Sequence, residues 1–532
     1  MKAIGAGCGC TIVLMLASGC LLGTVFSDYG DQINPDTLLF AGGGLWLVFS
    51  AMTIAGGYLK DRDDNAPGDS HGTAGFANNH ELAARGLLAD RGLVCGRSLG
   101  SGELIRFDEA GHLLTVAPTR SGKGVGAVIP NALKHPGSMV IIDPKGENAA
   151  VTARARREMG QEVYVLDPFD LVDEPSAQFN PLDFIRTGTI DAAEDADLVA
   201  EMLAETEGEA SASSSHFEET ARVLMRAVIL YVAETADERD RHLGEVRRRL
   251  TLPPEEFEAF LDEMSDSDVS HGSCARAANT IRSMADRERS GVISTARRHT
   301  DWLESPRFIE ALERSDFDLE DIKRRPTTVY LVLPPSKLER YRDFNRLAVG
   351  LSLAALQRDA YTKPDERIVY LLDEIAQLGH LSPLEQAVGV AAGYGITLWQ
   401  FWQDLSQLRS IYGDRWESFV SNAAVFQIFG VADKATAEYV SDLTGQTTVQ
   451  TVSKNQGISA QGAGGSIGHS DATTVGETGR ALLTADEVRR LDNDKQLLFK
   501  TGCRPALTRK VRYFEDPEFA GIFDDNPMYD GN

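Results

Sequence analysis

A glycine-rich segment between an apolar run and a helical pattern constrains the fold of this chain more than any other feature. Residues 115–130 read TVAPTRSGKGVGAVIP. Aligned with the phosphate-loop pattern G-x-x-x-x-G-K-[ST], they give Ala117, Gly122, Lys123 and Gly124, so the first glycine and the last hydroxyl are replaced. Backbone N–H groups in such a loop close around a phosphate at the start of a helix, and the lysine neutralises the β- and γ-phosphates. The segment therefore predicts a strand, a phosphate-binding loop and a helix, in that order.

This loop supplies the candidate nucleotide-binding residues. They are Thr119, Arg120, Ser121, Gly122, Lys123, Gly124 and Val125. Gly124 lacks the hydroxyl that usually helps to hold Mg²⁺, so Thr119 or Ser121 is expected to assist the metal instead. The alternative interpretation is a glycine-rich turn with a solvated lysine.

Two later apolar runs end in polar residues of the kind that ATP hydrolysis needs. RIVYLLDEI (367–375) ends in Asp373 and Glu374, and GITLWQF (395–401) leads to Gln403. One carboxylate would orient the Mg²⁺ shell and the next would polarise water, which predicts Asp373 as the metal ligand and Glu374 as a catalytic residue. Gln403, at the tip of a neighbouring strand, would sense the γ-phosphate. Each feature alone also fits a plain strand end, but their order and spacing behind Lys123 predict an ATPase that uses ATP and Mg²⁺.

Apolar, β-branched runs alternate with helical patterns along much of the chain. The runs are HLLTVAP (112–118), SMVIID (138–143), EVYVLD (162–167), TTVYLVL (327–333), RIVYLLD (367–373), GITLWQF (395–401) and AVFQIFG (424–430). This rhythm predicts an α/β fold with a buried parallel sheet. Between 187 and 325 the spacing is helical, interrupted by a Ser-rich stretch at 211–216, which predicts an all-α domain inserted into the α/β domain.

The remaining boundaries follow from changes of composition. Residues 61–186 and 326–532 are the two parts of the predicted nucleotide-binding domain, and 187–325 are the insertion. Within the second part, residues 453–479 are rich in Gly and Ser and predict a flexible loop. The acidic C-terminal tail predicts a solvated terminus, with an interaction tail as the alternative.

Two uncharged stretches at 3–26 and 37–59 are each long enough to cross a bilayer as a helix. Lys2, Lys60 and Arg62 flank the pair on one side, so residues 1–60 predict a transmembrane hairpin with both chain ends in the cytoplasm. The alternatives are a cleaved signal peptide and a lipoprotein site at Cys20. In either case the second stretch would still leave the bulk of the chain inside.

Charge restricts how this chain could contact nucleic acid. Its 532 residues carry 53 Lys and Arg against 79 Asp and Glu, a net charge of −26. A protein that grips nucleic acid over its whole surface should be basic. Any DNA contact must therefore be confined to a local patch such as a pore lining, or the cargo is something else. The 6 cysteines include no pair at metal spacing, so neither a zinc site nor a disulfide framework is expected.

The chain resembles the type IV secretion coupling proteins, the TraG/TraD-like family. The motifs that carry the resemblance run over nearly the whole chain: HGTAGFA (71–77), APTRSGKGVG (117–126), IIDPKGEN (141–148), VLDPFD (165–170), FNPLD (179–183), SHFEETARVLMRAVILYV (215–232), SDFDLEDI (315–322), YLLDEIAQLG (370–379), GYGITLWQFWQDLSQL (393–408), AEYVSDLTGQTT (437–448) and LLTADEVRRL (482–491). The resemblance implies a two-helix anchor in the bacterial inner membrane, a RecA-like domain with an all-α insertion that selects cargo, and a homo-hexameric ring with ATP at its subunit interfaces. It assigns Lys123 to phosphate, Asp373 and Glu374 to Mg²⁺ and catalysis, and Gln403 to the γ-phosphate.

One departure from the family concerns an arginine that is offered to the neighbouring subunit's nucleotide. TraD-like relatives carry it shortly before the sensor glutamine, where this chain has AAGYGITL (391–398). Arg346 and Arg409 are the candidates to replace it. In DPKGE (143–147), Lys145 or Glu147 is a candidate for contact with phosphate, Mg²⁺ or substrate, and a simple strand-exit turn with a helix N-cap is the alternative.

Three functions remain open from the sequence. The first is delivery of single-stranded DNA, bound to a relaxase, into a type IV secretion channel during conjugation. The second is delivery of secreted effector proteins by the same ATPase, and the third is a non-motor membrane receptor that docks cargo. A chromosome-segregation translocase would share the motor, but it would normally have more membrane spans and a C-terminal winged helix.

Overall fold

The structure is a computed structural model that describes residues 69–204, 212–459 and 468–528. The predicted spans at 3–26 and 37–59 lie outside these ranges. Among the described residues, no helix combines the length and the apolar character that crossing a bilayer requires. The chain falls into two units, Gly72–Thr447 with Arg480–Asn532, and Met1–His71 with Thr448–Gly479.

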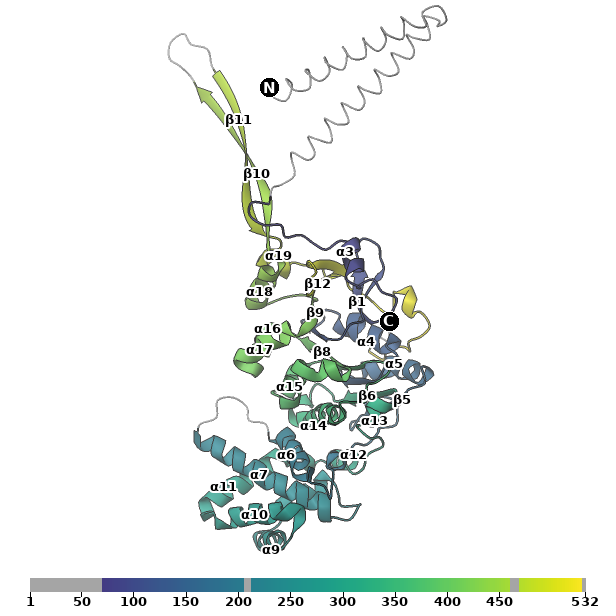
Figure 1. Ribbon diagram of the computed structural model, residues 1–532, viewed down its shortest axis with the longest axis vertical. Helices are drawn as coiled ribbons and strands as arrows, with labels where there is room; N and C mark the ends of the chain where they lie inside the picture. Colours follow the sequence, from purple (N-terminus) through teal and green to yellow (C-terminus); the bar gives the residue numbers. More distant parts are fainter. Residues whose placement is uncertain (1–68, 205–211, 460–467, 529–532) are drawn as a thin grey trace, which may run out of the picture. The chain divides into compact units, whose positions relative to one another are not determined.

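An eleven-stranded sheet forms the centre of the larger unit (Figure 1). Its strand order is β2-β1-β13-β12-β9-β3-β8-β7-β4-β6-β5. The strands from β9 to β5 in this order are parallel: β9 (Ala423–Ile428), β3 (His112–Val116), β8 (Ile396–Trp402), β7 (Ile368–Leu372), β4 (Met139–Asp143), β6 (Thr327–Val332) and β5 (Glu162–Leu166). Every residue of β3, β8, β7, β4 and β6 is buried, as expected for a parallel sheet covered on both faces. The predicted α/β fold with a mostly parallel sheet is confirmed.

Four short antiparallel strands extend this sheet beyond β9. They are β2 (Leu104–Phe107), β1 (Leu93–Ser98), β13 (Ala506–Arg509) and β12 (Lys495–Lys500). None of them is predicted from the sequence, because each is brief and mixes apolar with charged residues, as in LIRF and ALTR. The edge nevertheless brings the C-terminal part of the chain next to the strands that precede the phosphate loop.

Helices pack on both faces of the sheet. Those that follow its strands are α4 (Ile129–Lys134), α5 (Glu147–Glu158), α14 (Leu338–Arg358), α15 (Ser382–Val390), α16 (Leu405–Tyr412), α17 (Trp416–Ser421) and α18 (Lys434–Thr444). Successive residues of a strand point to opposite faces. Ile142 of β4 accordingly shares a buried cluster with Leu351 of α14, whereas its neighbour Ile141 shares a second cluster with Ala132 of α4.

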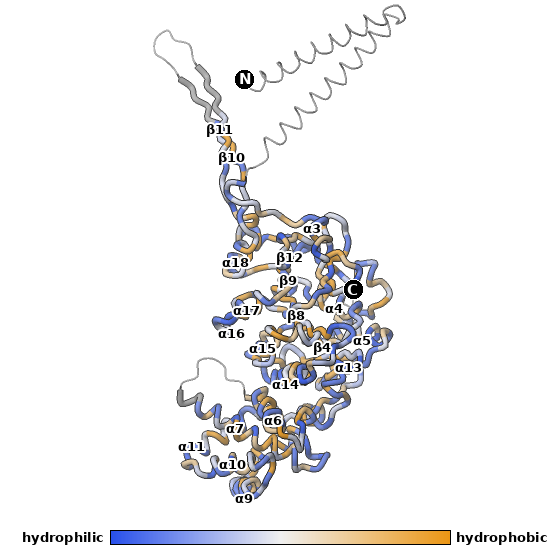
Figure 2. Tube along the Cα trace, viewed as in Figure 1, coloured by the Kyte–Doolittle hydropathy of each residue, from blue (hydrophilic) through white to orange (hydrophobic). Residues whose placement is uncertain are grey.

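Between β5 and β6 the described chain is largely helical, apart from turns and an isolated β-bridge of Ser176 with Val165. Residues 192–324 are called the helical lobe below. Its α-helices are α6 (Ala192–Leu203), α7 (Ala212–Thr235), α8 (Leu243–Leu250), α9 (Pro254–Ser265), α10 (Val269–Ser283), α11 (Asp286–His299), α12 (Pro306–Ala311) and α13 (Asp321–Arg324). Helix α7 is the centre of the lobe and packs against α6, α8, α10 and α11. Figure 2 shows apolar stretches along α6 and α7 as well as along the sheet. The lobe shares its core with the sheet face that α14 covers.

The predicted flexible loop at 453–479 is wrong for much of its length. Residues Gln446–Ser459 form β10 and residues Gly468–Ala481 form β11, and the two pair as a separate sheet. Both segments contain Thr and Val, which favour strands. Their polar composition on both faces hides the alternation by which a half-buried strand is recognised in a sequence.

Several residues of the acidic tail pack against the rest of the larger unit, so the predicted solvated terminus is wrong for these residues. Asp516 accepts hydrogen bonds from Arg97 of β1 at 2.6 and 2.7 Å. Asp524 pairs with Arg154 of α5 at 2.7 Å, and Phe519 is fully buried. The acidic groups find arginine partners on the domain itself, and the ring completes an apolar cluster.

Candidate active site

The candidate phosphate loop leaves the sheet at the end of β3. It enters a π-helical turn, Gly124–Val128 (η1), and then α4. Arg120 and Gly122 have φ angles of 65° and 90°, in the left-handed region that glycine adopts without strain. A Cβ on Gly122 or Gly124 would meet nothing within 4 Å, so the backbone on this side is open to a close-fitting ligand.

Four residues that the sequence predicts for one site meet at the carboxyl edge of the sheet. Lys123 Nζ lies 2.7 Å from Asp373 Oδ1 and 2.5 Å from Glu374 Oε1. Gln403 Nε2 donates a hydrogen bond to Glu374 Oε2 at 3.1 Å. Lys123 and Glu374 are 251 positions apart in the chain, so the fold and not the sequence brings them together.

The strand order explains why these four residues lie in contact. Strand β8 lies between β3 and β7, and the three are parallel, so their carboxyl ends share one edge. Lys123 follows β3, the acidic pair follows β7, and Gln403 follows β8. The glutamine therefore comes from the strand between the one that carries the lysine and the one that carries the carboxylates.

Glu374 stands on a constrained turn. Its φ angle of 51° is unusual for a residue other than glycine. Its amide donates to Asp373 Oδ1 at 2.9 Å, and a 3₁₀ turn, Ile375–Leu378 (η4), follows directly. Ile375 and Leu378 are buried. The backbone on both sides thus fixes the direction of the Glu374 carboxylate.

Burial and charge oppose each other in the acidic pair. Burial raises the pKa of Asp373, and the Lys123 ammonium only partly offsets this effect. Burial also acts to raise the pKa of Glu374, but Lys123 and the Gln403 hydrogen bond outweigh it and hold that pKa below its usual range. The pKa values of the two carboxylates are thus shifted in opposite directions, and a further cation beside Asp373 would favour its charged form.

The oxygen donors around the loop fit Mg²⁺ bound together with a nucleotide. Mg²⁺ is usually held by one or two carboxylates, phosphate oxygens and water. Asp373 supplies a buried carboxylate, and the Ser121 hydroxyl is buried with no hydrogen-bond partner in the described chain. Within the described ranges, no group of three or more His, Cys, Asp or Glu side chains could hold a metal by itself. Phosphate oxygens would have to complete the shell.

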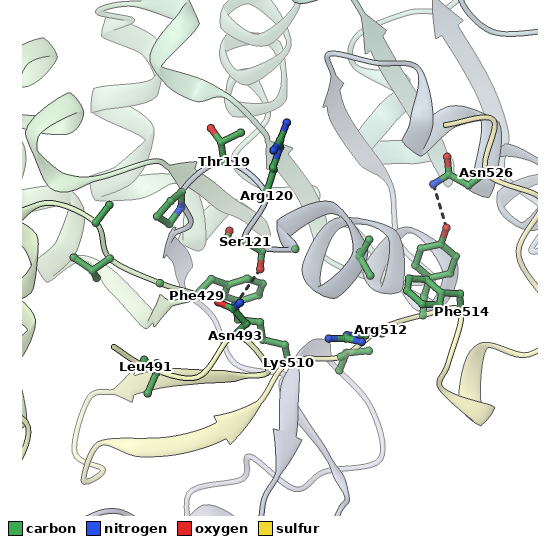
Figure 3. A pocket seen from close by; sticks show the side chains of 18 of the residues that line it. Thr119, Arg120, Ser121, Phe429, Leu491, Asn493, Lys510, Arg512, Phe514 and Asn526 are labelled. Atoms are coloured by element: carbon green, nitrogen blue, oxygen red, sulfur yellow. Dashed lines mark hydrogen bonds between the residues drawn. The ribbon is translucent and has the colours of Figure 1, made fainter. Parts of the chain in front are cut away.

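A cavity of about 810 Å³ opens beside the loop (Figure 3). Residues 118–122 line it together with residues 510–514, which follow β13. Its basic side chains are Arg120, Arg489, Lys510 and Arg512, and its aromatic side chains are Phe429, Tyr513, Phe514 and Phe523. In a chain of net charge −26, this gathering of basic groups next to a phosphate-loop sequence favours an anionic ligand with an aromatic part.

Lys510 is a part of this site that sequence reasoning missed. Its Nζ donates to the Ser121 carbonyl at 3.0 Å and lies 5.1 Å from the centre of the Phe429 ring. Burial lowers its pKa to about 8. Lys510 and Ser121 are 389 positions apart, and no motif marks Lys510. Only the unpredicted antiparallel edge brings it to the loop.

The structure places the remaining candidates, Arg346, Arg409 and the segment 143–147, in different environments. The expectation that Arg346 reaches a neighbouring subunit is wrong, because its side chain is 2% exposed and bonds inside the domain. Arg409 is exposed, with its guanidinium 4.5 Å from the Trp416 ring centre. The segment 143–147 forms the strand-exit turn: Asp143 accepts from the Ala149 amide of α5 at 2.8 Å, as a helix cap does.

Residues 75–526 match the family model described as type IV secretory system conjugative DNA transfer. The chain belongs to this family. The predicted resemblance to type IV secretion coupling proteins is thereby confirmed, and conjugative DNA transfer is the role after which the family is described.

Characterised relatives and solved structures agree with this assignment. The protein VirD4 of Rhizobium radiobacter is 29% identical over 85% of this chain and 65% of its own length. The conjugal transfer protein TraG of Escherichia coli is 29% identical over 93% of this chain and 84% of its own. This chain thus spans about two thirds of the VirD4 relative.

Among solved structures, the bacterial conjugative coupling protein TrwB is similar in fold. It has a TM-score of 0.61 at 17% identity, over 84% of this chain and 96% of that chain. Other structures of TrwB contain ADP with Mg²⁺, or a non-hydrolysable ATP analogue.

Proposed function

We propose that the protein is an ATPase that couples ATP hydrolysis to the delivery of single-stranded DNA into a type IV secretion channel. The observation that carries the proposal is the cluster in which Lys123 and Gln403 both bond to Glu374 at the ends of three adjacent strands. Membership of a conjugative DNA transfer family supports the cargo. The nucleotides seen in TrwB support ATP and Mg²⁺ as ligands.

ATP would bind with its phosphates over residues 119–125, where phosphate oxygens replace the two carboxylates as partners of Lys123. Asp373 and the Ser121 hydroxyl would hold Mg²⁺, which supplies positive charge against the phosphate oxygens. Once Lys123 turns to phosphate, Glu374 loses the ammonium that lowers its pKa and becomes a stronger base.

Glu374 would then take a proton from water while the water oxygen attacks the γ-phosphorus. The bond from that phosphorus to the β-phosphate oxygen breaks, and ADP leaves with the electron pair. Gln403 is bonded to Glu374 and stands at the end of β8. It would therefore pass the loss of the γ-phosphate to the strand between the loop and the acidic pair.

The cavity beside the loop would take the nucleoside. The aromatic side chains offer stacking surfaces for a base, and Lys510 and Arg512 offer donors to the ribose and phosphates. The nucleotide would thus touch the phosphate loop and the segment after β13 at once.

In the proposed assembly, residues 1–60 anchor the chain as two spans in the bacterial inner membrane with the bulk cytoplasmic. Six copies form a ring with ATP between subunits, and exposed Arg409 is the candidate to complete the neighbouring site. The helical lobe would receive the DNA with its relaxase, and the channel components would take the DNA onward.

The test is ATP hydrolysis by the full chain in lipid nanodiscs, with and without single-stranded DNA. Lys123→Ala should lower turnover by at least about a hundredfold, because phosphoryl transfer depends on positioned charge. Lys434→Ala, which removes a solvent-exposed lysine paired with Glu438, should hydrolyse normally. Normal turnover in Lys123→Ala would remove the basis of the proposal.

Protein cargo is the second candidate, and the net charge of −26 favours it. Hydrolysis that depends on Lys123 but ignores DNA would support secreted proteins as cargo. An intact chain that binds ATP without hydrolysing it would instead support a docking receptor.

A further inference from the structure

Arg346 of α14 joins the helical lobe to the turn that carries Glu374. Its Nε donates to the Met202 carbonyl at 3.0 Å. Its Nη1 donates to the carbonyls of Leu378 and His380 at 2.6 and 2.8 Å. The side chain is 2% exposed, so these bonds are made inside the protein, where a lost partner is not replaced by water.

The carbonyls that Arg346 holds lie at the ends of two different segments. Met202 is in the last turn of α6, in the lobe, and Leu378 is the last residue of η4. The final carbonyls of a helix have no partners within the helix and need donors from elsewhere. A single guanidinium thus completes the end of a lobe helix and the end of the turn that begins beside Glu374.

Gly350, one turn further along α14, contacts the same two segments. A Cβ at this position would stand 2.4 Å from the Met202 sulfur and 3.7 Å from Leu381 Cδ1. The absence of a side chain lets the end of α6 and the loop after η4 approach the helix closely. Arg346 and Gly350 therefore make one face of α14 the contact between the helical lobe and the turn that carries Glu374. This contact is called the joint below.

Only arginine has the geometry for this position. Its planar fork presents several N–H donors in fixed directions and stays charged when buried. A lysine has one nitrogen at the end of a flexible chain and cannot hold three carbonyls in these directions. A lysine in place of Arg346 would preserve charge while loosening the joint.

We propose that Arg346 is a positioning residue that couples the helical lobe to the Glu374 turn, so that cargo on the lobe changes the rate of ATP hydrolysis. The proposal rests on the proposed function for its readout. Helix α6 packs extensively on α7, the central helix of the lobe. A shift of the lobe therefore reaches the end of α6, then Arg346, and then the turn that aims the Glu374 carboxylate. Packed interfaces of this kind move between discrete arrangements and do not deform smoothly.

Arg358 provides a matched control on the same helix. Its guanidinium donates to the Phe184 carbonyl at 2.8 Å and pairs with Asp195 of α6 at 2.8 Å. It thus ties α14 to the first half of α6 and to the turn before it, and not to the end that Arg346 holds. Arg358→Lys should loosen the lobe without touching the joint.

The first measurement is amide hydrogen exchange in the full chain without nucleotide or DNA. Arg346→Lys should speed exchange in both the last turn of α6 and residues 375–381. Arg358→Lys should speed exchange in the first half of α6 only. If Arg346→Lys speeds exchange in only the last turn of α6 or only residues 375–381, Arg346 does not connect the two segments, whatever the hydrolysis shows.

The second measurement is the ratio of DNA-stimulated to basal ATP hydrolysis in nanodiscs. In Arg346→Lys the ratio should fall towards one, and Gly350→Ala, which keeps the arginine but displaces Met202, should lower it too. Arg358→Lys should keep the wild-type ratio.

A wild-type ratio in Arg346→Lys would overturn the coupling. Absence of hydrolysis in the wild-type chain would overturn the proposed function and the coupling together, and the exchange result would still decide whether the joint exists.

Discussion

A single ammonium group sets the charge balance of the candidate site. Lys123 lies within 2.7 Å of Asp373 and Glu374 at once. Charge-assisted hydrogen bonds of this kind are short and strong, so a ligand that takes the lysine must offer comparable negative charge in return. A triphosphate does so and also brings oxygens for a metal. A neutral ligand would leave the lysine with its carboxylates.

The first prediction concerns Glu374 as the base. Glu374→Gln keeps the size of the side chain and can still accept from Gln403, but it cannot take a proton from water. Turnover should fall by about 10²–10⁴-fold, the usual contribution of a general base, while nucleotide affinity is retained. Steady-state hydrolysis and titration with a fluorescent ATP analogue measure the two quantities separately.

Glu385→Gln is the matched control for this prediction. Glu385 is as sheltered as Glu374 and likewise has a cationic partner, Arg415 at 2.6 Å, but it lies on α15 away from Lys123. The Glu385→Gln variant should hydrolyse ATP normally. Equal losses in both variants would show that any partly buried, charge-paired carboxylate matters and that Glu374 has no special role.

The second prediction follows from the pKa of Lys510, which burial lowers from 10.5 to about 8. Asp492 and Asp494 oppose this shift and Arg512 adds to it. Between pH 8 and 10.5 the unfolded chain holds a proton on Lys510 that the folded chain has lost. The free energy of unfolding of the wild-type chain should therefore rise with pH in that window.

Lys510→Met removes this term, and Lys510→Arg stays charged in both states. The stability of Lys510→Met relative to wild type should therefore be greatest below pH 8 and should shrink as the pH approaches 10.5. The stability of Lys510→Arg should not rise with pH in this window, because its guanidinium stays charged in the folded and the unfolded chain. Denaturant titrations of the three chains at each pH provide the measurement, and a pH-independent difference for Lys510→Met would contradict the assignment.

The candidate site could be predicted from the sequence only as far as its residues lie in motifs. Lys123, Asp373, Glu374 and Gln403 follow strands in a recognisable order, and the fold brings them into contact. Lys510 could not be found, because its place depends on strands that carry no clear pattern. The burial of Arg346 was equally hidden, since nothing local distinguishes a surface arginine from one that holds three carbonyls.

At the scale of elements, burial on two faces decides which strands the sequence reveals. The central parallel strands are continuous apolar runs, such as MVIID in β4, and all seven predicted runs become strands. The antiparallel edge and the β10–β11 pair mix polar with apolar residues, so the alternation that marks a strand is weak or absent there. Prediction therefore succeeds for the parallel part of the sheet, which carries the site residues, and fails at the antiparallel edge.

The third prediction tests the docking of the acidic tail. Phe519 is fully buried in a cluster with Ile129, Leu133 and Val151, which belong to α4 and α5. Phe519→Ala should reduce the free energy of unfolding by about 3–5 kcal/mol, because it removes a buried ring and leaves a cavity. Urea titration followed by tryptophan fluorescence measures the change.

Phe514→Ala is the control within the same tail. Phe514 is 51% exposed, so removal of its ring should change the stability by no more than about 0.5 kcal/mol. If both variants had the same small effect, the tail would not be part of the folded core.

At the scale of the whole molecule, the charge distribution restricts how subunits and cargo can meet. A chain with a net charge of −26 repels both DNA and its own copies over most of its surface. An assembly therefore has to bring local basic groups to acidic ones, and an exposed arginine near a neighbour's nucleotide is one such contact. Arg409 meets the requirement of exposure, and its place above Trp416 fixes the guanidinium in direction.

The last prediction asks whether Arg409 acts across a subunit interface. Arg409→Ala and Lys123→Ala should each lose most ATP hydrolysis when expressed alone. When the two are co-expressed with different tags and purified through both, activity should return, since some interfaces then combine an intact Lys123 with a neighbour's intact Arg409. Random mixing in a head-to-tail ring makes about a quarter of the interfaces complete.

Arg415→Ala, which removes an exposed arginine paired with Glu385, should stay active alone. Mixed assemblies as inactive as their parents would mean that Arg409 serves its own subunit's site, and full activity of Arg409→Ala alone would remove it from catalysis. Recovery requires that the two residues belong to different subunits of one site, because two defects in the same subunit's site cannot repair each other.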